Sequence, residues 1–284
     1  MSDITIGAHK SAAGGYAKAC ERVADIGGDC LQLFSSSPRT WASADLSEKE
    51  VDDFKQAKEK HGLDPVVFHA PYLINLADRD STGEKSVKAM VNELNTADRC
   101  GIIGSVVHVG SYKTDDEKPE DKAHFKHLIE NIQAVLDKSD NGANLYIENM
   151  GTRKIGKDIE QIARIIDDCG RPDRLKVCLD TCHMHAAGID LSSDESYQDF
   201  FSEFDDVIGL DRLEVIHVND SKDPHGSLRD RHENIGEGSI PESVFTNILT
   251  KKPTKDLPLI IETPGFDENG PDQKNLKQLR SLLH

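Results

Sequence analysis

The feature that most constrains this chain is an eightfold alternation of short apolar runs with longer helical segments. The runs are rich in β-branched residues and continuously apolar, which is typical of parallel strands covered on both faces. The predicted strands span residues 4–9, 30–36, 65–70, 105–110, 144–150, 175–181, 213–220 and 257–263. The predicted helices span residues 12–27, 47–61, 83–100, 119–138, 157–169, 194–206, 240–250 and 271–283.

Eight strand-helix units in 284 residues match the size of a (β/α)₈ TIM barrel. No Pro/Gly/Ser-rich linker interrupts the pattern, so we expect one domain over residues 1–284. A doubly wound open α/β sheet is the structural alternative. The sequence contains no glycine-rich dinucleotide-binding turn to support that alternative.

The composition fits a protein of the cytoplasm. With 37% apolar residues the chain can bury a large core, and it has no apolar run of about 18 residues that would cross a membrane. Its beginning, MSDITIGAHK, lacks the basic and apolar regions of a signal peptide. The six cysteines form no CxxC pair, which indicates reduced thiols.

Acids and histidines stand at the carboxyl ends of six successive predicted strands. They are His69, His108, Glu148, Asp180, His217 and Glu262, and the loops add His183, Asp230 and His232. Any one of them alone fits a helix-capping acid or a core histidine. In a barrel, however, all these ends open onto the same face, where active sites are built.

A pocket that gathers these carboxylates needs positive charge, because like charges at close range repel one another. Cations are the simplest remedy. A mixed set of His, Asp and Glu suits zinc or manganese better than calcium or magnesium. Nine ligands exceed the needs of one tetrahedral ion, which predicts two or three ions with a shared carboxylate.

Seven motifs make the chain resemble endonuclease IV, the zinc-dependent apurinic/apyrimidinic endonuclease. They are HAPYLINLA, VVHVGS, IEN, LDTCH, HVND, DRHENIGEG and IET, in order from His69 onward. LDTCH together with DRHxxxGEG is highly specific. The resemblance covers nearly the whole chain, and it implies a (β/α)₈ barrel with three zinc ions and the activity of deoxyribonuclease IV (phage-T4-induced).

The resemblance also implies a role for each ligand, with Mn²⁺ as an alternative metal at one or more sites. Carried over by position, His69 and His108 hold the first zinc, and Glu148 bridges the first and second. Asp180, His217 and Glu262 complete the second site, and His183, Asp230 and His232 hold the third. Glu148 and Glu262 are the implied catalytic residues, with the attacking water next to Glu148.

The implied substrate is double-stranded DNA with an abasic site or a blocked 3′ end. Cleavage 5′ to the abasic site leaves a 3′-hydroxyl and a 5′-deoxyribose phosphate. Arg39, Tyr72 and Leu73 match the residues that the family inserts into the duplex. From the residues alone, Arg39 fits a solvated loop cation and Tyr72 a ring packed beside His69. The family analogy favours a monomer.

Two other functions remain open from the sequence. A sugar isomerase related to xylose isomerase gathers similar ligands for two metals, but it needs neither the DRH pair nor a bulky pair after the third strand. A non-catalytic metal-binding or damage-recognition protein is the other. A structural zinc site is usually closed, four-coordinate and often thiolate-rich, unlike this ligand set.

Three further residues lie near the motifs but outside the implied ligand set. Cys182 stands between two implied ligands, and we expect it to be a small buried residue. The family has an apolar or aromatic residue at the position of His185, and we expect an exposed histidine rather than a group supporting the ligands. His9 ends the first predicted strand and is a candidate for lining the pocket.

The charge balance predicts an unusual salt response. With 34 basic and 51 acidic residues the net charge is −17, and the acids, rich in Asp as in high-salt proteins, are spread along the chain. This excludes broad DNA binding through a basic stripe and makes the surface repel DNA. At about 1 M salt the Debye length falls to about 3 Å, which shortens that repulsion.

We therefore expect nicking activity to fall less between about 0.1 and 1 M monovalent salt than for DNA-binding proteins that rely on counterion release. The measurement is the initial rate on an abasic duplex across that range. A steep loss would show that the acidic surface does not have this effect.

Overall fold

Eight parallel strands close into a barrel in the computed structural model, which describes residues 4–112, 122–139, 142–152 and 154–283. The order around the ring is β1-β10-β7-β6-β5-β4-β3-β2, so strands adjacent along the chain are also adjacent in space. The barrel strands are β1 (Ile6–His9), β2 (Leu31–Phe34), β3 (Val66–His69), β4 (Gly104–Val107), β5 (Asn144–Glu148), β6 (Leu175–Asp180), β7 (Leu213–His217) and β10 (Leu259–Ile261).

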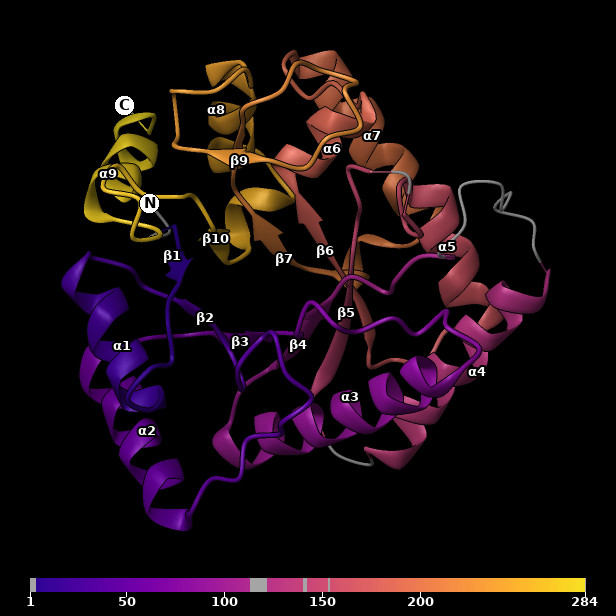
Figure 1. Cartoon of the computed structure of the whole chain (residues 1–284). Helices are drawn as coiled ribbons and strands as arrows, with labels where there is room; N and C mark the ends of the chain where they lie inside the picture. The colour runs from indigo at the N-terminus through magenta and orange to yellow at the C-terminus, as the bar shows by residue number, and fades with distance from the viewer. Residues whose placement is uncertain (1–3, 113–121, 140–141, 153, 284) are drawn as a thin grey trace.

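Helices follow the strands and surround the ring (Figure 1). They are α1 (Tyr16–Asp25), α2 (Glu48–His61), α3 (Ser81–Cys100), α4 (Lys122–Lys138), α5 (Ile159–Asp168), α6 (Thr181–Ala187), α7 (Asp194–Val207), α8 (Glu242–Thr250) and α9 (Gln273–Ser281), with short 3₁₀ turns at Leu210–Arg212 and Thr254–Asp256. The predicted (β/α)₈ barrel is confirmed, and the open sheet is excluded. None of the described helices has both the length and the apolar character needed to cross a membrane.

The boundaries differ from the sequence predictions where glycine intervenes. The helix predicted from residue 12 begins at Tyr16, because Gly14 and Gly15 adopt φ values of +88° and +104° that end any helical path. The helix predicted over 119–138 is observed as α4, and residues 119–121 lie outside the described part of the chain.

Two elements were not predicted. Helix α6 follows β6 directly, and a small antiparallel hairpin pairs β8 (Asp220–Ser221) with β9 (His232–Glu233). Both are too short to show the apolar periodicity on which such predictions depend. Both carry residues of the predicted metal centre.

The apolar core has two parts. A large one lies between the strands and the helices, and a smaller one fills the inside of the barrel. The inner part consists of Cys30, Val67, Val106, Tyr146, Cys178, Val215 and Ile260, all fully buried. Burying one large aliphatic side chain contributes about 1.5–3 kcal/mol, so this inner layer stabilises the folded barrel. The candidate ligands lie beyond it, at the carboxyl ends of the strands.

Candidate metal centre

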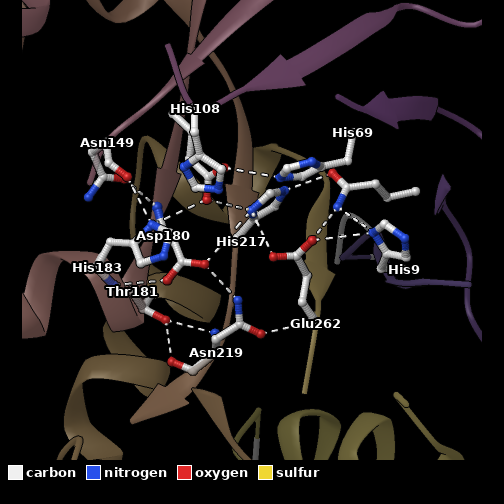
Figure 2. Close-up of polar contacts among 12 residues, drawn as sticks. His9, His69, His108, Asn149, Asp180, Thr181, His183, His217, Asn219 and Glu262 are labelled. Atoms are coloured by element: carbon white, nitrogen blue, oxygen red, sulfur yellow. Dashed lines mark hydrogen bonds and ion pairs between the residues drawn. The ribbon is translucent and has the colours of Figure 1, made fainter. Parts of the chain in front are cut away.

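The side chains that end the strands converge at one mouth of the barrel. Four of them are the last residue of a strand: His69 of β3, Glu148 of β5, Asp180 of β6 and His217 of β7. His108 and Glu262 follow β4 and β10 by one residue. Figure 2 shows His69, His108, His183, His217, Asp180 and Glu262 facing one another.

Glu148 lies at the centre of this cluster and is fully buried. Its Oε2 is 3.3 Å from His69 Nε2 and 3.2 Å from His108 Nε2. Its Oε1 is 3.1 Å from His217 Nδ1. The two oxygens of one carboxylate therefore face two different groups of side chains, which is the arrangement of a bridging ligand.

Three groups of potential ligands have their donor atoms close enough to share an ion. They are His69 with His108 and Glu148; Glu148 with Asp180, His217 and Glu262; and His183 with Asp230 and His232. The structure thus brings together all nine residues singled out from the sequence, in the same three sets.

Cys182 also approaches Asp180 and His232. It is fully buried, as expected, and burial raises the pKa of its thiol to about 12.

The charges in the cluster are strongly coupled. Burial by itself would raise the pKa of Glu148, but the neighbouring His108 and His217 outweigh it and hold that pKa well below its usual range. Burial would likewise lower the pKa of His69, yet Glu148 and Glu262 raise it to about 9. Burial prevails at His108 and lowers its pKa to about 4. The carboxylates thus create a field that attracts cations into the site.

Three buried polar atoms of the cluster lack a hydrogen-bond partner: Glu148 Oε2, His183 Nε2 and His232 Nε2. A buried polar atom without a partner costs about 1–3 kcal/mol, so natural structures rarely leave several together. All three face the centre of the cluster. Histidine nitrogens and carboxylate oxygens aimed at a shared point fit divalent transition-metal ions such as zinc.

Backbone carbonyls fix the orientation of three of the histidines. Nδ1 of His69 contacts the carbonyl of Ala70 at 2.9 Å, Nδ1 of His183 that of Asn149 at 2.9 Å, and Nδ1 of His232 that of Glu262 at 3.4 Å. A carbonyl only accepts, so each Nδ1 carries the proton and each Nε2 is left to face the cluster. Such partners hold ligand rings in place in metalloproteins.

Asp180 both caps a helix and faces the cluster. Its Oδ1 caps α6 by accepting the backbone N–H of His183 at 3.0 Å. Its Oδ2 faces the cluster, 3.8 Å from His217 Nδ1, and accepts from the Asn219 amide at 2.6 Å. Asn219 also accepts the backbone N–H of Glu262 at 2.7 Å. One asparagine therefore links two predicted ligands.

The loop that carries Asp230 and His232 is anchored by Asp220, which is fully buried. One oxygen of Asp220 accepts the backbone N–H groups of Gly236 and Gly238 at 3.0 Å each. Its other oxygen accepts those of Ser221 at 2.7 Å and Ile240 at 3.0 Å. A Cβ at position 238 would lie 2.3 Å from Asp220 Oδ1, so this glycine is required for close approach.

The predicted DNA-contacting residues lie at the rim. Tyr72 is 67% exposed, with its ring centroid 5.3 Å from that of Phe34. Leu73 is half-buried and Arg39 is exposed. Tyr72 and several of the candidate ligands line an open cavity of about 450 Å³. The ring of Tyr72 does lie beside that of His69, with centroids 6.4 Å apart, but it is mostly exposed and is not part of the core.

The two other histidines singled out from the sequence lie outside the ligand set. The expectation that His185 is exposed is wrong: it is 6% exposed, and its Nε2 lies 3.1 Å from the hydroxyl of Ser239. It faces away from the cluster because it lies on the opposite side of α6 from His183. His9 does line the cavity, 3.3 Å from Glu262.

Sequence reasoning missed several polar residues that support the ligands, namely Gln32, Asn149, Asn219 and Asp220. Three of them belong to the IEN and HVND motifs, yet no role was assigned to them. Gln32 carried a usable signal, because it is the polar residue inside an otherwise apolar strand.

The fold is a (β/α)₈ barrel with groups of potential metal ligands at the carboxyl ends of its strands. A family model described as a xylose isomerase-like TIM barrel matches residues 20–283. A D-tagatose 3-epimerase-like protein superposes with a TM-score of 0.71 over 98% of this chain and 97% of the other, at 18% identity. That likeness concerns the fold alone.

Relatives with higher sequence identity indicate the family to which this barrel belongs. A protein named probable endonuclease 4 from Halothermothrix orenii is 38% identical over 282 residues, 98% of this chain and 99% of that protein. The crystal structure of endonuclease IV from Thermus thermophilus superposes with a TM-score of 0.84 at 33% identity, over 98% of both chains. The chain belongs to the endonuclease IV family.

The anchoring role of Asp220 can be tested with Asp220→Asn. The amide nitrogen cannot accept, so backbone N–H groups lose their acceptor, at about 1–3 kcal/mol for each group left unpaired. We expect lower stability in urea and faster proteolysis within residues 222–238.

Glu237→Gln is the control, because Glu237 is an exposed carboxylate of the same loop. Substitutions of exposed side chains usually change stability by no more than about 0.5 kcal/mol, so this variant should remain near wild type. Equal losses in both variants would contradict the anchoring role.

Proposed function

We propose that this protein is a DNA-repair nuclease that hydrolyses the phosphodiester 5′ to an abasic site in duplex DNA. The products are a 3′-hydroxyl and a 5′-deoxyribose phosphate, and the same site trims blocked 3′ ends. The observation that carries the proposal is the clustering of three adjoining ligand groups around one bridging carboxylate. The printed names of the relatives support the nuclease class.

Three zinc ions are the proposed cofactors, in the three ligand groups defined above, with manganese as an alternative. When bound, such ions neutralise the phosphate, supply a nucleophile at neutral pH and stabilise the leaving oxygen. Glu148 and Glu262 are the proposed catalytic carboxylates. Glu148 is held rigidly by burial, whereas Glu262 is reachable from the cavity.

The rim residues complete the proposal by selecting the damaged nucleotide. A sugar without a base has no stacking to lose, so it leaves the helix at little cost. Tyr72 and Leu73 lie just after His69 in the chain, and Tyr72 is free to stack because its ring is mostly exposed. Burial and the charge of Glu262 raise the pKa of Tyr72, and the positive charge of Arg39 opposes them.

A sugar isomerase fits less well. It would need the two ligand groups that share Glu148, but the third group of His183, Asp230 and His232 would have no purpose. The exposed tyrosine at the cavity mouth is likewise unneeded for a small sugar. We also propose that the enzyme acts as a monomer in the cytoplasm, where its six buried free cysteines stay reduced.

The metal proposal is tested with an abasic oligonucleotide duplex on a denaturing gel, with and without a strong chelator. We expect nicking that the chelator abolishes and added zinc restores. Elemental analysis of the purified protein should give well above one equivalent of zinc or manganese. Full activity of metal-free protein would refute the proposal.

Glu262→Gln tests the ligand assignment, since it keeps the shape and removes one negative charge. We expect the nicking rate to fall by about two to three orders of magnitude, because each 1.36 kcal/mol of lost stabilisation costs about tenfold. Glu268→Gln is the matched control: Glu268 lines the same cavity but is exposed and outside the ligand groups. Near-normal turnover in Glu262→Gln would mean that the assignment is wrong.

Tyr72→Ala tests recognition of the damaged site. Because the ring is exposed, melting temperature and metal content should stay near wild type. Binding to an abasic duplex should weaken by about 1–3 kcal/mol, the value of an aromatic ring stacked on a base. The loss should shrink when the abasic site lies in a short single-stranded gap, where little stacking must be broken.

Arg39→Ala should add to the loss on duplex DNA. Phe266→Ala is the control, an exposed aromatic on the loop after β10 that does not line the cavity. A large drop in melting temperature, with equal damage on both substrates, would assign Tyr72 to the core instead.

A further inference from the structure

Gln32 lies inside the barrel on β2, fully buried, and bridges two of the proposed ligands of the second ion. Its Nε2 is 2.5 Å from Glu262 Oε1, and its Oε1 is 2.8 Å from His217 Nε2. Nε2 is also 3.0 Å from His9 Nδ1. Every polar atom of this amide therefore has a partner, and the partners are side chains at the mouth of the barrel.

The chemistry of Glu262 decides which way the amide faces. An ionised carboxylate only accepts hydrogen bonds, so the group beside Oε1 must be the NH₂ of Gln32. The amide oxygen then faces His217 Nε2 and can only accept. It follows that His217 carries a proton on Nε2.

The orientation of His217 leaves its other nitrogen for the ion. Nδ1 lies 3.1 Å from Glu148 Oε1, 3.4 Å from Glu262 Oε2 and 3.8 Å from Asp180 Oδ2. These are the other members of the same ligand group. The ring is fully buried, so no water can take the place of Gln32 at Nε2 without rearrangement.

His217 is thereby set apart from His69, His183 and His232, whose Nδ1 atoms face backbone carbonyls. In those three the partner is part of the main chain and cannot be removed by substitution. The partner of His217 is a side chain from a distant part of the sequence, 185 positions away.

We propose that Gln32 is a positioning residue for the second metal ion. It fixes the Nε2–H tautomer of His217, so that this histidine binds through Nδ1, and it holds Oε1 of Glu262 so that Oε2 faces the ion. This inference rests on the proposed function only in requiring that the ligand groups bind metal. Partners of this kind typically change metal affinity about 10- to 100-fold when they are removed.

The tautomer is tested first in the unaltered protein. Zinc-loaded enzyme labelled with ¹⁵N-histidine is examined by long-range ¹H–¹⁵N correlation, and His217→Asn assigns the His217 signal. We expect His217 to be bound through Nδ1 with a proton on Nε2, and His69, His183 and His232 to be bound through Nε2. A His217 bound through Nε2 would overturn the inference.

Gln32→Met then tests the consequence, because methionine keeps the length and apolar bulk without either hydrogen bond. Competition with a chromogenic chelator should show one equivalent of zinc bound about 10- to 100-fold more weakly, with the remaining zinc unchanged. Unfolding of the variant and of the wild type in excess chelator shows whether the substitution changes the stability of the metal-free fold. Should the Gln32→Met variant fail to fold, Gln32→Leu provides the same measurement with a smaller side chain.

Tyr146→Phe is the matched control. It also removes a hydrogen bond of a side chain inside the barrel, from Tyr146 to Glu214 at 2.9 Å, but this part-buried bond lies nearer the amino ends of the strands. Zinc affinity should be unchanged there. Equal weakening of all zinc equivalents in Gln32→Met, or the same loss in Tyr146→Phe, would reduce Gln32 to a general structural role. Wild-type protein that binds neither zinc nor manganese would refute the proposed function itself.

Discussion

The burial of one carboxylate, Glu148, is the constraint on which the rest of the site depends. An ionised acid without water is very costly in a protein interior unless positive charge surrounds it. Here His69, His108 and His217 contribute nitrogens within 3.3 Å of its two oxygens. The barrel brings these histidines to Glu148 because the carboxyl ends of its parallel strands lie at the same end of the barrel, so that the residues there are neighbours.

Around Glu148, many polar groups orient the side chains of the other candidate ligands. Backbone carbonyls fix three histidine rings, Asn219 links Asp180 to the backbone of Glu262, and Asp220 ties down the loop that bears His232. Each of these contacts restricts the rotation of a side chain or the movement of a loop.

The strongly acidic chain and its proposed DNA substrate are compatible because recognition is local. Attraction for a phosphate must arise at the cavity itself, since the net charge of −17 repels DNA at a distance. The proposed ions would concentrate the needed positive charge there, and the exposed ring of Tyr72 at the rim would contribute by stacking, which does not depend on charge. Under this proposal, recognition and cleavage both take place at one face of the barrel.

The sequence by itself determined the barrel and the positions of the candidate ligands. Continuous β-branched runs alternating with helices leave few folds, and acids or histidines at the ends of six runs mark one face whatever the details of packing. Only the tertiary structure decided which atoms meet: that His185 turns away from the centre, that Asp180 both caps α6 and faces the cluster, and that Gln32 reaches His217 across the barrel. The periodicity of a segment predicts whether it forms a strand or a helix. Hydrogen bonds between residues far apart in the chain depend instead on the pairing register of the strands in the closed barrel.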